Sequence, residues 1–428
     1  MMKTIMKRIM CVMLCVLLLM GMCACGNDEG KETDKKDIAN VDELAITDEL
    51  KSVFYTKNVV NETVLFMEDE ETKTLLYKPD KIVSVTSYDG KITYEEGVDY
   101  ELKDGKLVLL SGSSIPCINK SDYYPAEQTG VTIYLEENIS YAPLYWGDGD
   151  AMTKWQVCVN YTHSDSWVGY KQESNSDRYS NFVQKLKDGE DVTVQFYGDN
   201  ITVGANSSFQ AAMEPEQYPY TILFLQTLAE VFDYTIKFVD LYSDVTVPKE
   251  DLILGERGTI TCVNNAVKNL TTEQALSDFD MMVKTNLDDY GCDLFVLALG
   301  IKDVKEGAES VVANQKKILE KVIKTVPNVS LMLVSTMIPH PETNVDVFQD
   351  EQEVEMLRIA DELNSAGNPC AVACMTSVSK SVCEFKDYQD CSGNNVDEPN
   401  DFMSRIYAHT LFQTLIGYEN VKSMIVSE

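Results

Sequence analysis

The second half of the chain alternates between strand-like and helix-like segments, and this alternation constrains the fold more than any other feature. Residues 192–197 are rich in β-branched and aromatic side chains, and 294–299 form a nearly continuous apolar run, as expected for a strand buried on both faces. Residues 219–232 have the apolar periodicity of a helix. Repeated strand–helix units of this length predict an α/β fold, a parallel sheet with helices on both faces. We expect further strands at 260–263, 329–334 and 371–374, and further helices at 311–325, 350–364 and 401–416.

Residues 49–175 have the features of an all-β module that precedes this sheet. The segment 81–86 is rich in β-branched residues, and 100–110 has a hairpin pattern in which Asp104-Gly105 supplies the positive-φ positions of a type I′ turn. Short strands at close spacing, without a long helical period between them, predict a β-sandwich or jelly-roll module. Further strands of this module are expected at 131–135 and 155–159.

The N-terminus has the layout of a secretory signal. Lys3, Lys7 and Arg8 precede the almost wholly apolar stretch 9–22, and a small residue and Cys25 follow. The apolar stretch is short for a stable membrane span. Cysteine directly after a small residue resembles a bacterial lipobox, and the alternative is an ordinary cleaved signal peptide.

The lipobox resemblance implies that residues 1–24 are removed and that Cys25 is diacylated. Acyl chains hold a protein to a bilayer through their buried methylenes, so we expect anchoring to the outer face of a bacterial cytoplasmic membrane. Residues 25–48 begin with a polar, charged stretch and are expected to form a disordered tether. The β module is then assigned to 49–175 and the α/β domain to 176–428.

The charge of the chain and the spacing of its cysteines limit which ligands it can bind. The chain has 69 acidic and 36 basic residues, for a formal charge of −33, and such a surface repels nucleic acid. Eight cysteines follow Cys25, either paired in disulfides or buried as small apolar side chains. No C-x-x-C spacing occurs among them, so we predict neither a metal centre nor a cofactor.

The segment that follows the first strand of the α/β part carries a family resemblance. Gly198-Asp199-Asn200-Ile201-Thr202 resembles the first block of the SGNH (GDSL) hydrolases, which place Gly-Asp-Ser-Ile-Thr at the tip of the first strand. The resemblance implies that position 200 is that of the nucleophilic serine. A carboxamide has no nucleophilic oxygen that a base can activate, so acyl-enzyme chemistry has no starting atom at Asn200.

The other three blocks of this family are present with the same kind of replacement. Residues 264–271 resemble the second block, whose glycine donates its backbone N–H to the oxyanion; Asn269 stands there. Gly-x-Asn-Asp appears at 300–303 with Lys302 at the asparagine position. In the last block, Asp-x-x-His, Asn395 stands at the position of the acid and Glu398 at that of the general base.

All four signature residue types are thus replaced, while the frame around them fits the pattern. Four blocks in order imply an SGNH-hydrolase-like (flavodoxin-like) domain with the catalytic positions degenerate. The frame residues that match are Gly198, Asp199, Ile201, Thr202, Gly204, Gly300, Asp303, Pro399 and Asp401.

Two hypotheses concern the replaced positions themselves. Lys302 and Glu398 occupy positions that converge in this fold. We expect an ion pair between them, because a lone buried charge is costly. The alternative is that both side chains point to solvent at the rim of the cleft. His340 follows a strand and is the one candidate for a relocated base, whereas His163 and His409 are expected to be structural.

Three functions fit these observations. The leading one is a surface lipoprotein without catalytic activity that binds a glycan or a protein partner. The second is an esterase or deacetylase of carbohydrate esters with a rewired site. The third is a scaffold whose working part is the β module, with Tyr123, Tyr124, Tyr145 and Trp146 as the stacking platform. The ligand-binding candidates are Asp199, Asn200, Lys302, Asp303, His340 and Glu398.

Overall fold

The computed structural model describes residues 41–125, 132–133, 144–241, 243–304, 306–343 and 348–424. The predicted signal peptide, Cys25 and most of the predicted tether lie outside these residues. Residues 38–428 form one compact unit. Within the described ranges, no helix is long and apolar enough to cross a membrane.

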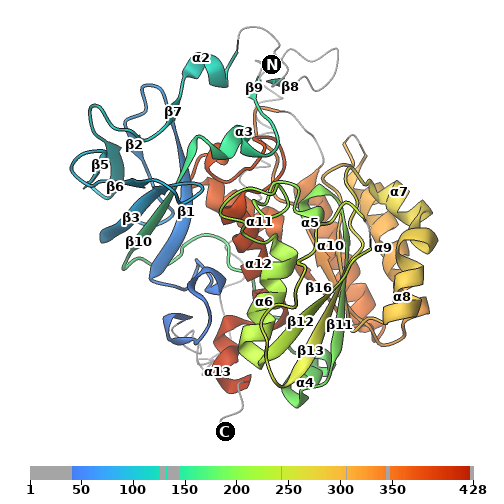
Figure 1. Ribbon diagram of the computed structural model, residues 1–428. Helices are drawn as coiled ribbons and strands as arrows, with labels where there is room; N and C mark the ends of the chain where they lie inside the picture. The colour runs from blue at the N-terminus through green and yellow to red at the C-terminus, as the bar shows by residue number, and fades with distance from the viewer. Residues whose placement is uncertain are drawn as a thin grey trace, which may run out of the picture. The chain divides into compact units, whose positions relative to one another are not determined.

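The predicted parallel sheet is confirmed (Figure 1). Its six strands follow the order β12-β13-β11-β14-β15-β16, and each neighbouring pair is parallel. Because β11 lies between β13 and β14, the chain leaves it first toward one edge and later toward the other. The strands are β11 (Val192–Gly198), β12 (Tyr234–Val239), β13 (Gly258–Asn264), β14 (Leu294–Ala298), β15 (Ser330–Val334) and β16 (Cys370–Ala373).

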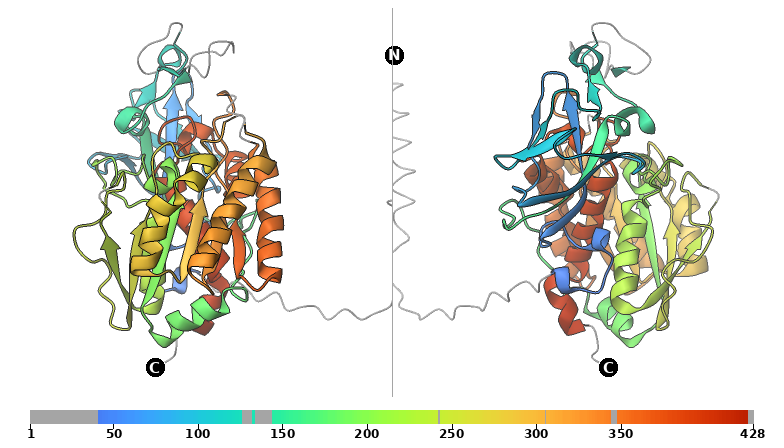
Figure 2. Two further views of the ribbon diagram at one scale, coloured as in Figure 1. Left: turned by 90° about the vertical axis from the view of Figure 1, so that its right-hand side faces the viewer. Right: turned by 60° about the vertical axis from the view of Figure 1, so that its left-hand side comes forward.

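Helices cover both faces of this sheet (Figure 2). Alternate residues of β11 belong to different cores: Phe196 lies in the cluster with α6 and α12, and Tyr197 lies in the cluster with α7, α9 and α10. All five residues of β14 are buried, as its apolar run predicts. The helices are α4 (Ser180–Asp188), α5 (Asn200–Val203), α6 (Tyr220–Phe232), α7 (Thr272–Ser277), α8 (Thr285–Tyr290), α9 (Ala308–Thr325), α10 (Gln349–Ser365), α11 (Met375–Cys383), α12 (Asp401–Leu415) and α13 (Val421–Met424).

Local sequence explains where the main elements begin and end. Asn400 accepts a hydrogen bond from the Met403 N–H and so caps α12, and Thr271 forms a capping box with Gln274 at the start of α7. Sequence patterns missed β12, α4, α7, α8 and α11. Each of these elements is short, with nine residues at most, which is too few for a clear period.

The predicted β-rich module is also confirmed. A five-stranded sheet has the order β4-β3-β10-β1-β7, and a three-stranded sheet has the order β2-β6-β5. Asp104 and Gly105 join β5 and β6 with φ values of 54° and 78°, as the predicted type I′ turn requires. The elements are β1 (Asn58–Met67), β2 (Thr72–Lys73), β3 (Lys81–Ser87), β4 (Thr93–Tyr94), β5 (Tyr100–Lys103), β6 (Lys106–Leu109), β7 (Cys117–Ile118), α2 (Lys120–Tyr123), β8 (Thr132–Ile133), β9 (Leu144–Tyr145), α3 (Asp150–Thr153) and β10 (Gln156–Thr162).

The β module shares its core with the α/β part. Thr63 of β1 donates to the Asp390 carbonyl at 2.5 Å, and the Leu65 N–H donates to the Asp390 carboxylate at 2.7 Å. Gln156 of β10 donates to the carbonyls of Gln389 and Ser392. The segment that follows α11 is therefore held in place by the β module.

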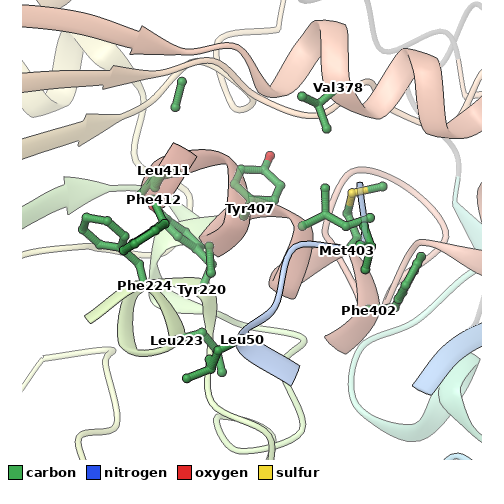
Figure 3. Packing of buried hydrophobic residues seen from close by; sticks show 14 of the residues in the cluster. Leu50, Tyr220, Leu223, Phe224, Val378, Phe402, Met403, Tyr407, Leu411 and Phe412 are labelled. Atoms are coloured by element: carbon green, nitrogen blue, oxygen red, sulfur yellow. The ribbon is translucent and has the colours of Figure 1, made fainter. Parts of the chain in front are cut away.

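The prediction of a tether that extends to residue 48 is wrong at its end. Val41, Leu44 and Ile46 are buried, in and after the short 3₁₀ helix η1 (Val41–Glu43), and η2 (Asp48–Leu50) follows. Figure 3 shows Leu50 beside Leu223 of α6, the helix on which η2 packs. Burial of these apolar side chains orders the segment. The polar residues around them in the sequence led to the prediction of disorder.

Candidate functional site

The positions that the family resemblance assigns to catalysis meet at the carboxyl ends of three neighbouring strands. Asn200 follows β11, Asn269 follows β13, and Lys302 follows β14. Glu398 lies in the loop that leads into α12. This is the point where the strand order reverses direction, the usual ligand site of an open parallel sheet.

The Asn200 carboxamide is fixed by two partners. Its Nδ2 donates to Glu398 Oε1 at 2.7 Å, and its Oδ1 accepts from the Asn269 backbone N–H at 2.5 Å. Asn269 has φ 59°, a conformation that favours glycine and that asparagine tolerates. The N–H that the family resemblance assigns to the oxyanion therefore persists, but it binds the side chain at the nucleophile position.

The predicted ion pair between Lys302 and Glu398 is confirmed. Lys302 Nζ lies 3.3 Å from Glu398 Oε1 and only 2.7 Å from Asp397 Oδ2. The Glu398 side chain is 3 % exposed, so the alternative of a solvent-facing rim is wrong. Burial alone would lower the pKa of Lys302, but the two carboxylates raise it above its ordinary value. Sequence reasoning missed Asp397, although two adjacent acids at a buried position require a shared cation.

Glu398 has both carboxylate oxygens engaged. Oε2 accepts from Asn206 Nδ2 at 2.6 Å, and the same amide nitrogen donates to Asp148 Oδ1 at 3.1 Å. Burial raises the pKa of Glu398, and the neighbouring Asp397 carboxylate adds to this effect. Asn206 lies in the loop after α5, and no motif marked it in the sequence. We call Asn200, Asn206, Lys302, Asp397 and Glu398 the polar cluster.

Two other predicted ligand-binding acids stabilise the frame around the polar cluster. Asp199 caps α5 through a 3.1 Å bond from the Ile201 N–H, while its Oδ2 is buried without a hydrogen-bond partner among the described residues. Burial raises the pKa of Asp199 to about 7. Asp303 accepts from the Thr272 N–H and from its hydroxyl, which fixes the start of α7.

His340 lies in a separate set of contacts. Its Nδ1 accepts from the Glu342 N–H at 3.1 Å, which assigns the proton to Nε2, 3.3 Å from the Tyr123 hydroxyl. Asn395, at the position of the orienting acid, bonds to the same hydroxyl and to the Tyr145 carbonyl. Burial lowers the pKa of His340 to about 4. A ring with both nitrogens engaged in this way does not serve as a base for position 200.

The remaining histidines have structural places. His163 stacks on Tyr77 with ring centroids 3.8 Å apart. His409 bonds to the Glu49 carbonyl, and burial lowers its pKa to about 3. Both findings agree with the expectation that these side chains pack in the core.

One of the four aromatic residues predicted as a stacking platform in the β module is internal. Tyr123 is fully buried and bonded to His340 and Asn395. Tyr124, Tyr145 and Trp146 are half-buried.

The eight cysteines after Cys25 that the structure describes are all free thiols, and six of them are buried. This agrees with the expectation that they pack as small apolar side chains. No group of three or more potential metal ligands gathers within the described residues.

The polar groups of the cluster are engaged with one another. The space between Asn200, Asn206, Glu398 and Pro399 is too small to hold a water molecule. Asn200 carries no nucleophilic atom, and the Glu398 carboxylate is occupied by three donors. The geometry therefore supplies neither the nucleophile nor a free base of acyl transfer.

Replacement of Lys302 by methionine is expected to lower the free energy of unfolding by about 3 kcal/mol, because the Asp397 and Glu398 carboxylates would stay buried without their cation. Urea unfolding measures this loss. The additional changes Asp397→Asn and Glu398→Gln are expected to restore most of the stability. If Lys302→Met costs no more than Lys284→Met, which breaks the exposed pair with Asp288, the cluster is not a buried charge network.

No family model and no curated protein matches the chain. Among solved structures, the chain is similar to a two-domain esterase active on acetylated mannans, with 15 % identity and a TM-score of 0.41 over 60 % of this chain and 55 % of that chain. It is also similar to an acetylxylan esterase from Geobacillus stearothermophilus, with 15 % identity and a TM-score of 0.37 over 53 % of this chain and 95 % of that chain.

A third similar structure is a GDSL-like lipase from Parabacteroides merdae, with 14 % identity and a TM-score of 0.37 over 53 % of this chain and 96 % of that chain. The chain spans just over half of the length of the two-domain esterase. At these identities the likeness concerns the fold alone.

Proposed function

We propose that this chain is a lipid-anchored surface protein that has lost hydrolase activity and binds a glycan. The observation that carries the loss of activity is the polar cluster, in which Asn200 is bonded to Glu398 and Asn269 and Glu398 is also paired with Lys302. The groups at four of the positions that the family resemblance assigns to catalysis, Asn200, Asn269, Lys302 and Glu398, are each held by another of the four. The anchor rests on the N-terminal sequence with Cys25.

A second feature supports binding. A groove of about 680 Å³ lies between residues 87–94 of the β module and the loop 212–214, with Asp150 and Lys154 on its wall. We call it the outer groove. Its volume falls in the range of small-molecule sites, and it combines apolar side chains such as Ile92 and Met213 with charged groups. Such a surface suits a saccharide, which offers hydroxyl groups and apolar ring faces.

The rewired esterase remains the second candidate because of one observation. Asp199 has a buried oxygen without a partner among the described residues and a pKa of about 7, the value of an effective general base at neutral pH. The lack of a nucleophile at Asn200 and the three donors that occupy the Glu398 carboxylate argue for the binding function instead.

Affinity electrophoresis of the full chain through gels that contain acetylated xylan, mannan or no polysaccharide tests the binding function. We expect retardation by at least one polysaccharide and its loss in the double variant Lys91→Ala, Met213→Ala, which removes two outer-groove side chains. The matched control is Gln184→Ala, in a hollow of about 720 Å³ at the amino ends of the strands. Equal mobility in every gel, or equal loss in the control, contradicts this assignment.

A further inference from the structure

A smaller pocket adjoins the outer groove and reaches the interior. It holds about 90 Å³ and shares Tyr88 with the outer groove. Its walls come from β1, β3, β10, the loop near Gln217, and α12, which contributes Asp401 and Arg405. We call it the inner pocket. One water needs only ~10–15 Å³ of such space, so the inner pocket has room for a small polar group.

Arg405 makes the inner pocket unusual. Its side chain is 1 % exposed, and Nη2 donates to the Asn61 carbonyl at 2.7 Å. Nε and Nη1 are buried and have no hydrogen-bond partner among the described residues. The Phe402 ring lies 5.5 Å from the guanidinium carbon, a cation–π distance. A buried guanidinium in this state is costly unless an acceptor reaches it.

Asp401 adds a second unpartnered atom to the same pocket. Its Oδ1 accepts from the Ser208 N–H at 2.9 Å, whereas Oδ2 is buried without a partner in the described part of the chain. Asp401 and Arg405 lie one turn apart on α12, but they are not among the ion pairs of the described residues. Asp401 and Arg405 thus both line the inner pocket, and together they hold two guanidinium nitrogens and one carboxyl oxygen that have no hydrogen-bond partner among the described residues.

We propose that the inner pocket binds a carboxylate group, and that the natural source of this group is an acidic sugar whose ring lies in the outer groove. A guanidinium donates charge-assisted hydrogen bonds to a carboxylate, and such bonds are among the strongest in proteins. The pocket is too small for a whole pyranose, but it opens beside the larger groove. This inference rests on the proposed glycan-binding function and names the class of glycan.

The charges around the inner pocket decide how binding depends on pH. Burial raises the pKa of Asp401 to about 6. The groups that face Asp401 and Arg405 are the Tyr88 hydroxyl from the end of β3, the Cys158 thiol from β10 and the more distant Glu49 from η2. Burial raises the pKa of Cys158 to about 12 and that of Tyr88 above its ordinary range, so both are neutral at pH 5 to 8.

Protonation of Asp401 therefore favours an anionic ligand. Below about pH 6 the protonated Oδ2 donates a hydrogen bond to the carboxylate, and the pocket loses one negative charge. Above this pH the ionised Asp401 repels the ligand. A sugar carboxylate is ionised at pH 5, so its affinity is expected to be about tenfold higher at pH 5 than at pH 8.

Isothermal titration calorimetry of the full chain in mild detergent tests the proposal with three probes: acetate, glucuronate and a glucuronate-bearing xylan oligosaccharide, each against its neutral counterpart. We expect saturable binding of the charged probes only, with the oligosaccharide tightest. The Lys91→Ala, Met213→Ala variant should weaken the oligosaccharide and leave acetate unchanged. If acetate binds as tightly as the oligosaccharide, the source of the group is a small free carboxylate and the assignment to an acidic sugar is overturned.

Two variants separate the inner pocket from general effects. Arg405→Gln is expected to weaken glucuronate at least tenfold, and Asp401→Asn is expected to abolish the pH dependence while keeping the affinity seen at pH 5. Should Arg405→Gln fail to fold, Asp401→Asn still decides, because its amide preserves the size of the side chain. Retention of binding and of its pH dependence in these variants overturns the proposal, as does the absence of carboxylate binding. Binding of neutral xylan that is unaffected by both variants overturns only this inference and leaves the glycan-binding function intact.

Discussion

Replacement of Lys386 by methionine is expected to lower the free energy of unfolding by about 3–5 kcal/mol. Lys386 Nζ lies 2.7 Å from Glu62 Oε1, and both side chains have no exposed surface. Glu62 also accepts from the Tyr161 hydroxyl and the Leu76 N–H, and Lys386 donates to the Thr63 carbonyl. Without the cation, the Glu62 charge would be buried between β1 and the segment after α11 without compensation.

Urea unfolding followed by circular dichroism and tryptophan fluorescence measures this loss. The matched control is Lys380→Met, which breaks the exposed pair with Asp350 and should cost less than about 1 kcal/mol. The double variant Lys386→Met, Glu62→Gln should recover part of the stability. Because the pair joins the β module to the α/β part, both probes should report a single transition. Two separate transitions would show that the two parts do not share a core. Equal losses in Lys386→Met and Lys380→Met would show that the pair of Lys386 with Glu62 is not a buried charge pair.

Restoration of the family residues is expected to create esterase activity. The variant combines Asn200→Ser, Asn269→Gly, Lys302→Asn, Asn395→Asp and Glu398→His, which supply the nucleophile, the oxyanion donors, the orienting acid and the base. We expect hydrolysis of a small aryl acetate at least about 100-fold above that of the natural chain, the contribution of one well-placed general base. The single variant Asn200→Ser should stay inactive, because the Glu398 carboxylate that faces position 200 is occupied by Asn206 and Lys302. Circular dichroism controls for folding.

No gain of activity in a folded restored variant would mean that the polar cluster is not the sole reason for inactivity. The contacts of Asn395 would be a second reason. This side chain bonds to the Tyr123 hydroxyl and the Tyr145 carbonyl. An aspartate at position 395 would still bond to the Tyr123 hydroxyl and would then not orient the histidine introduced at position 398. The further change Tyr123→Phe would remove this competing partner.

The fold was predictable because its signals are periodic and strong. The buried run at β14 and the long helices α6, α9, α10 and α12 have lengths and patterns that the sequence alone defines. Short elements such as α7 and α8 have no such signal. The burial of Val41, Leu44 and Ile46 was also hidden, because it depends on packing against helices far along the chain.

The candidate site was predictable only where the family blocks place residues. The pairing of Lys302 with Glu398 follows from two replaced positions that converge in the fold. Asp397 and Asn206 complete the cluster from positions without a motif, and their roles depend on loop geometry that sequence patterns do not specify. Arg405 was also not predictable, because a single basic residue in a helix gives no sign that its guanidinium is buried.

Turnover of acetylated xylan and of a small aryl acetate by the natural full chain shows whether the polar cluster is inactive. We expect no hydrolysis above buffer, unchanged by Glu398→Ala or His340→Ala, because the polar cluster offers neither a nucleophile nor a free base. Clear turnover that Glu398→Ala or Asp199→Asn abolishes would contradict it and identify the polar cluster as a rewired active site.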